Sequence, residues 1–293
     1  MERLHEYITL REKQFSIRAM CRVLKVSESG YYRSLNRTRT PRPWQLLLVK
    51  IREILAEHPD NSNYGVKRMR LALEQKDIIE SRSTVRRAMK KGGLLKDSPR
   101  RPAGLTKADA DAQKAENLIR RDFTADAPNR KWLTDITQIP CRDGKLYIAP
   151  VLDCYNGEIV GLAMDDNMKK ELCIRAFESA CKFQSTGGMI LHSDRGSQFT
   201  SAAFRNALAR HGAVQSMSGT GRCYDNARME SFFATLKKEK LYKIRTDRLP
   251  MAQVKSIVFR YIMTYYNRIR VNTVNPRGLS PTMYRQAAKG LAA

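Results

Sequence analysis

Residues 131–165 contain the pattern that most restricts the fold of this chain. Three strand-like runs, KWLTDITQI, KLYIAPVLD and EIVGLAM, are separated by the turn sequences CRDG and CYNG. Short turns between such runs predict a three-stranded antiparallel meander. Beyond it, helices are expected at about 168–184, 200–211, 226–241 and 250–267, with strands at 189–192 and near 213–217. This order predicts an α/β domain of ribonuclease-H type, a mixed sheet with flanking helices.

Three acidic residues lie where such a domain would bring them together. Asp135 lies inside the first strand, Asp194 follows the fourth strand, and Glu230 lies one turn into a helix. A carboxylate in an apolar strand is costly to bury without a partner or a metal ion. Each acid alone fits a core polar group, a turn or a solvated surface equally well. Together they suit phosphodiester chemistry with two Mg²⁺ or Mn²⁺ ions, because hard ions bind oxygen ligands.

Lys237 lies about two helical turns after Glu230 and therefore projects from nearly the same face. A cation there can hold a DNA end beside the metal ions, and the alternative is a solvated lysine in a KKEK run. Ser197 and Gln198, in the loop after Asp194, are candidates for DNA contacts.

Other polar residues nearby are expected to have structural roles. Asp225 and Asn226 are expected to cap the helix that carries Glu230, with Asp225 as the alternative third metal ligand. His192 is expected to end its strand rather than act as a ligand or base. Turn roles are expected for Asp153, Asp165 and Asp166.

The chain before residue 96 is predicted to be helical and basic. Residues 16–36 have the helix, short turn and helix of a DNA-reading unit, and a plain helical hairpin fits them equally well. Helices are also expected at about 45–58 and 65–76, and from Ser83 as N-cap to just before Gly92. The last helix has a cationic face suited to DNA phosphates, or simply a solvated one, formed by Arg86, Arg87, Lys90 and Lys91.

The composition favours a nucleic-acid partner. The 293 residues carry a formal net charge of +25, which attracts polyanions, while 42% apolar residues suffice for a packed core. No lipid anchor, membrane span or signal peptide is recognisable, so no membrane association is expected. Six scattered cysteines without a CxxC motif indicate reduced thiols in a cytoplasm, and four histidines form no zinc spacing.

The segments WLTDIT, HSDRGSQF and YDNARMESF resemble the core motifs of bacterial transposases, the OrfB product of the insertion sequence three family. The two aspartates, 35 intervening residues and a glutamate also match the pattern of retroviral integrases. NYGVKRMR followed by STVRRAMKKGGL is similar to the family's upstream DNA-binding segment, and YYNRIRVN through LSP to its C-terminal end. Family members often have Arg-x-His there, whereas Arg270 is followed by Val271 and Asn272. The zinc module of retroviral integrases is also absent.

The resemblance implies a transposase that cleaves and joins DNA strands by phosphoryl transfer at the terminal inverted repeats of a mobile element and at target DNA. Asp135 and Asp194 would bind both metal ions, and Glu230 would complete one site. It further implies a multimer that pairs two ends, a cytoplasmic, nucleoid-associated bacterial protein, and a chain that can be the downstream half of a frameshifted fusion with an upstream-frame product. The alternatives are a nuclease of the same fold that only hydrolyses DNA, and a non-catalytic DNA-binding regulator.

These expectations divide the chain into five segments. They are a helix-turn-helix segment at 1–40, a helical DNA-binding domain at 41–95, a linker at 96–122, an integrase-like catalytic core at 123–285 and a tail at 286–293.

Overall fold

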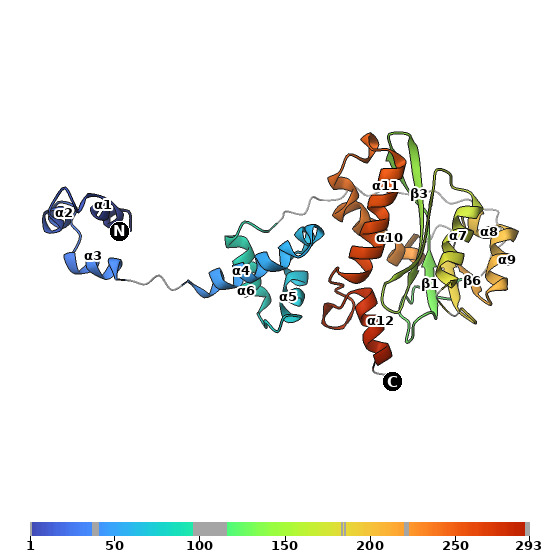
Figure 1. Ribbon diagram of the computed structural model, residues 1–293. Coiled ribbons are helices and arrows are strands. Elements are labelled where there is room, and N and C mark those ends of the chain that lie inside the picture. Colours follow the sequence, from blue (N-terminus) through green and yellow to red (C-terminus); the bar gives the residue numbers. More distant parts are fainter. Residues whose placement is uncertain are drawn as a thin grey trace. The chain divides into compact units, whose positions relative to one another are not determined.

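The computed structural model describes residues 2–36, 41–95, 116–182, 184, 186–219 and 223–290 (Figure 1). The chain forms two compact units, Met1–Leu47 and Leu48–Ala293. The boundary between them falls within helix α4 (Pro43–Ala56). No helix in the described ranges is both long enough and apolar enough to span a bilayer.

The first unit is built on three short helices, α1 (Glu2–Arg11), α2 (Ile17–Val23) and α3 (Glu28–Leu35). Its small core gathers Ile8, Met20, Cys21, Val26 and Tyr31. As predicted, Ser27 caps α3, because its hydroxyl accepts a hydrogen bond from the Gly30 backbone N–H. The predicted helix, short turn and helix of residues 16–36 therefore corresponds to α2 and α3.

The second unit begins with a helical segment that continues from α4 through the 3₁₀ turn η1 (Pro59–Asn63) to α5 (Val66–Glu74) and α6 (Arg82–Lys91). The predicted N-cap of α6 is wrong by two residues. Ser81, and not Ser83, accepts a hydrogen bond from the Thr84 backbone N–H, while the Ser83 hydroxyl bonds to that of Ser81. Gly92 is the C-cap, as the sequence predicted.

A mixed sheet forms the centre of the second unit. Its segments are β1 (Lys131–Thr134), β2 (Thr137–Cys141), β3 (Gly144–Asp153), β4 (Ile159–Asp165), β5 (Ile190–Ser193) and β6 (Val214–Met217). Strand β3 pairs antiparallel with β1, β2 and β4, which confirms the predicted meander. Strand β5 lies parallel between β1 and β6. The register against β3 does not shift between β1 and β2, so these two segments form one interrupted strand.

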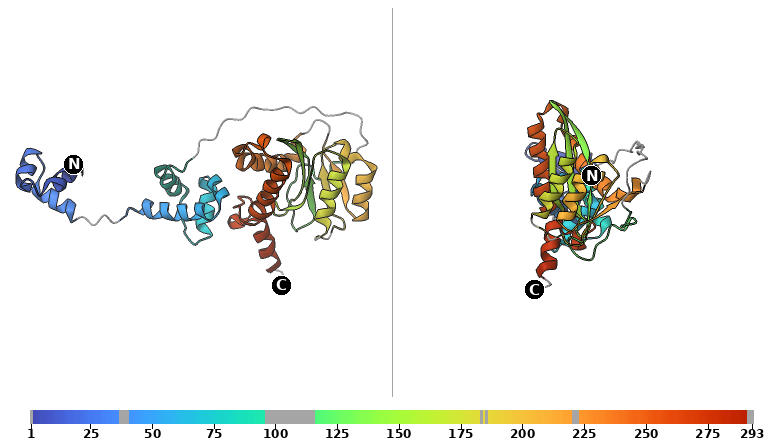
Figure 2. Two further views of the ribbon diagram at one scale, coloured as in Figure 1. Left: turned by 45° about the horizontal axis from the view of Figure 1, so that its top comes forward. Right: turned by 90° about the vertical axis from the view of Figure 1, so that its right-hand side faces the viewer.

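Helices cover both faces of this sheet, giving three layers (Figures 1 and 2). One layer contains α7 (Lys170–Cys181), α8 (Ser197–Thr200) and α9 (Ala202–Arg210), which close over an apolar core that includes Trp132, Phe177 and Phe204. The other contains α10 (Ala227–Glu239), α11 (Met251–Phe259) and its π-helical continuation η5 (Arg260–Tyr266).

Two parts of the second unit differ from the sequence expectation. Helix α12 (Pro281–Gly290) was not predicted. Residues 96–115, most of the expected linker, lie outside the described residues. Residues 116–122 contact the core: the Leu118 backbone N–H donates to the Ser216 hydroxyl, and Ile119 is buried.

Candidate active site

Asp135 lies in the break between β1 and β2, and not inside a continuous strand as the sequence suggested. Continuing the register places it opposite Pro150, which has no N–H to donate to the ladder. The Ile136 backbone N–H donates instead to Asp135 Oδ1 at 2.7 Å. The interruption thus frees a partly exposed carboxylate from regular strand geometry at the end of β1.

Asp194 occupies the equivalent place on the neighbouring strand. Strands β1 and β5 are parallel, and Leu133 pairs with His192. Asp135 and Asp194 each follow that pair by two residues, so they leave the same end of adjacent strands. Parallel neighbours lie about 4.8 Å apart. Asp194 is exposed, and its Oδ1 accepts a hydrogen bond from the Gly196 backbone N–H at 3.0 Å.

Helix α10 brings Glu230 to this end of the sheet. Asn226 precedes the helix, but its side chain does not cap it. The Asn226 amide donates instead to the Thr134 carbonyl at the end of β1, at 3.2 Å, which ties the start of α10 beside Asp135. Glu230 is exposed in the first turn.

Asp225 is neither the helix cap nor a free ligand. It is buried, and its carboxylate accepts hydrogen bonds from the Asn117 amide, the Arg121 guanidinium and the Gly219 backbone N–H at 2.8–2.9 Å. These bonds hold the segment before β1 against the start of α10.

The charges of the three acids act on one another. Burial, then the charge of Asp194, then that of Glu230 raise the pKa of Asp135 to about 7, against the opposing Ile136 N–H and the charge of Lys237. Burial and the charges of Asp194 and Asp135 also raise the pKa of the Cys173 thiol to about 12. The charges of Asp194, Glu230 and Lys237 therefore all act on Asp135.

This site has the donor chemistry of a hard divalent ion. The charges of two further carboxylates and one lysine act on Asp135, and burial, followed by the charge of Asp194, raises its pKa. Within the described ranges, no three His, Cys, Asp or Glu side chains are already gathered tightly enough to ligate one ion. Asp135 and Asp194 each accept a backbone N–H instead. The residue types and placement fit the ion, while its binding requires side-chain rotation.

Comparison with known proteins agrees with this geometry. Models of an integrase core domain match residues 125–223 and 230–288, and a model of an HTH-like domain matches residues 43–102. The chain is 34% identical over 275 residues to an IS600 protein of Shigella sonnei, covering 94% of this chain and all of that one. It is 32% identical over 290 residues to the transposase InsF for IS3A of Escherichia coli, covering 95% and 96% of the two chains.

The chain belongs to the IS3 family of insertion-sequence transposases. It has an integrase catalytic core and acts in DNA transposition as a polynucleotidyl transferase. The transposase for IS904 of Lactococcus lactis is 35% identical over 78% of this chain and 89% of its own.

Two viral structures were also found to be partly similar to this chain. A chain of the simian T-cell lymphotropic virus intasome superposes with a TM-score of 0.44 at 17% identity, covering 69% of this chain and 70% of its own. The HTLV-2 integrase catalytic core domain in complex with magnesium gives a TM-score of 0.41 at 17% identity, covering 55% and 99%.

The remaining sequence candidates in the transposase core have different surroundings. Ser197 is exposed at the start of α8, whereas the Gln198 amide donates to the Met168 carbonyl at 2.9 Å. His192 is buried between the hydroxyls of Ser216 and Ser218, and burial lowers its pKa to about 4. His192 is therefore a neutral core residue.

The four cationic candidates on α6 are all exposed. The opposite side of that helix buries Val85, Ala88 and Met89. The helix thus presents the surface formed by Arg86, Arg87, Lys90 and Lys91 away from its own core.

Two buried ionic clusters were missed by the sequence analysis. In the first, Glu239 accepts hydrogen bonds from both Arg270 Nε and Nη2, at 2.9 and 2.8 Å, and from the Tyr261 hydroxyl. Arg68 of α5 completes this cluster, with Nη2 at 2.7 Å from Glu239 Oε1. A signal was present, because Phe232, Leu236 and Glu239 have helical spacing and so place an acid on the apolar stripe of α10.

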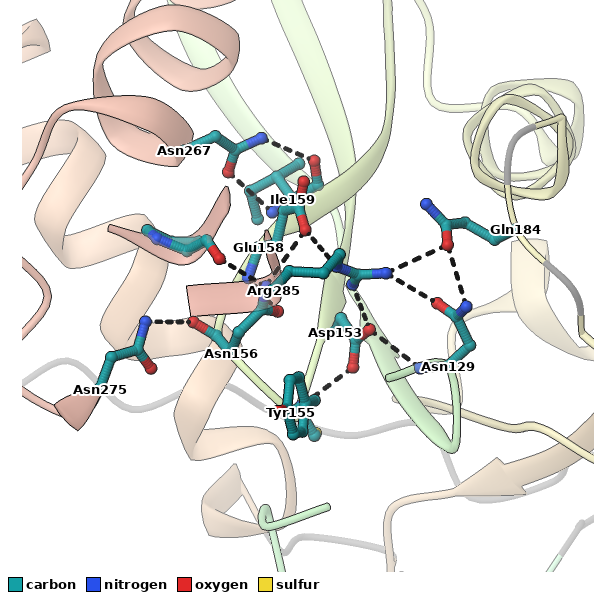
Figure 3. A network of polar contacts seen from close by, with 12 residues as sticks. Asn129, Asp153, Tyr155, Asn156, Glu158, Ile159, Gln184, Asn267, Asn275 and Arg285 are labelled. Carbon is teal, nitrogen blue, oxygen red and sulfur yellow. Dashed lines mark hydrogen bonds and ion pairs between the residues drawn. The ribbon is translucent and has the colours of Figure 1, made fainter. Parts of the chain in front are cut away.

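The second cluster fixes α12 to the sheet (Figure 3). Asp153, which is fully buried, lies 2.5 Å from Arg285 Nη2 and also accepts the backbone N–H groups of Asn129 and Tyr155. Arg285 Nε lies 2.6 Å from Glu158 Oε2. Asp153 therefore stabilises the predicted turn through Tyr155, and pairs with a charge 132 residues away. In a separate turn, at the end of β4, the Asp166 backbone N–H donates to Asp165 Oδ1.

Proposed function

We propose that this transposase cleaves and joins DNA strands at the ends of its insertion sequence with two Mg²⁺ or Mn²⁺ ions held by Asp135, Asp194 and Glu230. The observation that carries the proposal is geometric: Asp135 and Asp194 follow the same end of adjacent parallel strands, and the Asn226 amide joins the start of the Glu230 helix to the end of β1. When bound, the ions would activate an attacking water or 3′-hydroxyl oxygen and stabilise the leaving oxygen.

The chain's own residues prepare this site. At the ends of β1 and β5, two of the carboxylates accept hydrogen bonds from the N–H groups of Ile136 and Gly196. Asp135 is half-protonated near neutral pH while no cation is present, so added positive charge favours its ionised form. Glu230 comes from α10, whose start is bonded to the end of β1.

DNA binding is divided between two regions in this proposal. Near the acids, Lys237, Ser197 and Gln198 contact the DNA end. On α6, Arg86 and its three cationic neighbours bind phosphates. The family implies terminal inverted repeats and target DNA as substrates, a multimer that pairs two ends in the bacterial nucleoid, and an upstream-frame product as a further partner.

The test is cleavage of a labelled duplex that contains the element's end, with Mg²⁺ present. Asp135→Asn and Glu230→Gln are expected to bind the duplex normally and to lose cleavage. If either variant cleaves at the normal rate, the assignment of these acids is wrong. Cleavage by the unmodified chain without strand joining would favour the hydrolytic nuclease, and binding without cleavage would favour the regulator.

Lys237 is tested against its neighbour on the same helix. Lys237 projects close to Glu230, whereas Lys238 is exposed and lies about 100° further around α10. Lys237→Ala is expected to lower end cleavage by orders of magnitude through lost positioning, with overall DNA affinity little changed. Lys238→Ala is the matched control and should cleave normally. Equal losses would indicate a diffuse charge effect instead.

A further inference from the structure

A cationic cavity of about 230 Å³ lies beside α10, away from the three acids. Its α10 wall is formed by Arg228, Ser231 and Thr235. Their spacing of three and four residues places them on one side of the helix, about 100–160° around the axis from Glu230. The cavity is therefore a separate feature of the helix that carries the candidate metal ligand.

Positive charge dominates the walls of this cavity. Arg68, Arg228 and Arg270 line it, and Glu239 pairs with two of them. Arg228 Nη1 donates to the carbonyls of Phe123 and Cys154, which carry no formal charge. The three guanidinium groups carry three positive charges, and Glu239 neutralises one of them, so a net charge of about +2 remains at the cavity.

Tyr266 shows that these charges converge. It also lines the cavity. Burial raises the pKa of its phenol, the charges of Arg270, Arg228 and Arg68 lower it, and that of Glu239 raises it. The Arg270 guanidinium carbon lies 5.3 Å from the centre of the Tyr266 ring. All three arginines therefore act on one point at the cavity wall.

Unused donors surround the same space. Across the described parts of the chain, the hydroxyls of Ser231, Thr235 and Tyr266 make no hydrogen bond with protein atoms, and neither does Arg228 Nη2. A β-carbon at Gly157 would come within 3.4 Å of that Nη2, so the glycine leaves room beside it. Hydroxyl and guanidinium donors in a positive field match the oxygens of a phosphate group.

We propose that this cavity binds a phosphate group of the DNA backbone. The ligand chemistry is a phosphoryl group, and DNA is its source because the cavity adjoins the catalytic helix; in this choice the inference rests on the proposed function. A helix with its side chains is about 10–12 Å across, so the cavity lies about one helix width from the Glu230 side of α10, and a DNA strand at Glu230 can extend that far. Because Arg68 comes from α5, the phosphate would bridge the HTH-like segment and the core.

The test introduces a carboxylate at the rim of the cavity. Ser231 is exposed, so Ser231→Glu places negative charge there without filling the protein core. Gln253→Glu, at an exposed position of α11, makes the same charge change elsewhere and is the matched control. Binding of the full chain to an end-containing duplex is measured over a range of salt in EDTA. Ser231→Glu is expected to weaken binding about tenfold at low salt and to lower the log–log salt slope by about one unit, and Gln253→Glu to change neither.

An unchanged slope for Ser231→Glu, or equal losses in both variants, would overturn the proposal. A second measurement uses Ser231→Cys, with alkylation of position 231 followed by mass spectrometry. Slower alkylation in the presence of the duplex supports the proposal. If inorganic phosphate slows alkylation and the duplex does not, DNA is not the source of the phosphate. Both experiments omit divalent ions. Their outcome is therefore independent of the cleavage test. The cavity proposal can fail although Asp135→Asn abolishes cleavage, and it can hold although Asp135→Asn does not.

Discussion

Replacing Glu239 by glutamine would leave two arginines without the carboxylate that holds them together. The side chains of Glu239 and Arg270 are each 9% exposed, and that of Arg68 is 22% exposed. Removing one member of a buried ion pair costs roughly 3–5 kcal/mol, because an uncompensated charge stays buried. Glutamine keeps the shape and one acceptor oxygen, and Arg68 reaches solvent, so we expect about 3 kcal/mol. For a unit of this size that lowers Tm by about 6–12 °C.

The effect of Glu239→Gln should depend on pH in a defined direction. Burial alone would raise the pKa of Glu239, but the hydrogen bonds and charge of Arg270 and the charge of Arg68 hold it below its ordinary value. A carboxylate with a lowered folded-state pKa stabilises the fold above its unfolded-state pKa, about 4.3, and loses that contribution as the pH falls through the folded-state value. The difference in stability between Glu239→Gln and the unmodified chain is therefore complete at pH 7, and it shrinks below about pH 4.

The assay is thermal unfolding of both chains at pH 7 and at about pH 3, below the unfolded-state pKa of a glutamate. Glu80→Gln is the control, since Glu80 is partly exposed in the loop before α6 and its replacement should change stability by less than about 0.5 kcal/mol. If Glu239→Gln melts within 2 °C of the unmodified chain at pH 7, α5 and α10 are not held together by this cluster, and the reasoning is refuted.

Three further outcomes follow from the structure. Because protons compete with cations at Asp135, whose pKa is about 7, the rise in Tm caused by Mg²⁺ should grow between pH 6 and pH 8, and a rise independent of pH would contradict the site. Arg285→Met should lower the free energy of unfolding in urea by roughly 3–5 kcal/mol, since Asp153 is left buried and unpaired, and a change below 1 kcal/mol would show that the pair is dispensable. Arg86→Ala should lower the salt slope of DNA binding by about one unit, whereas an unchanged slope would remove α6 from the interface.

The sheet could be predicted from the sequence because its signals are local. Turn sequences separate the three strand-like runs, and each run contains its own apolar pattern. The interruption at Asp135 could not be predicted in this way. It becomes intelligible only once the register is known, because Pro150 is distant in sequence and comes opposite Asp135 through pairing. Similarly, Ser81 and Ser83 are equally good caps by residue type, and the choice depends on which hydroxyl reaches Thr84.

The buried ionic clusters were missed for a different physical reason. A charged side chain is normally solvated, so Glu239 in a KKEK run and Arg285 near the C-terminus indicate surface positions. Their burial is stable only because partners arrive from distant segments, and pairings of that kind leave no periodic signal. The acid on the apolar stripe of α10 was the one local sign of this arrangement.

The position of Glu230 is determined from both ends of α10. At the N-terminal end, the Asn226 amide bonds to the carbonyl at the end of β1, next to Asp135. At the C-terminal end, Glu239 joins the helix to Arg68 of the HTH-like segment and to Arg270. Phosphoryl transfer requires reacting groups to be placed within fractions of an ångström. A helix fixed at one end only could pivot, whereas attachments at both ends hold its first turn against the sheet. Since the second attachment includes α5, the same contacts that place Glu230 also set the distance from the candidate catalytic site to the α5–α6 pair, and so to the cationic surface of α6.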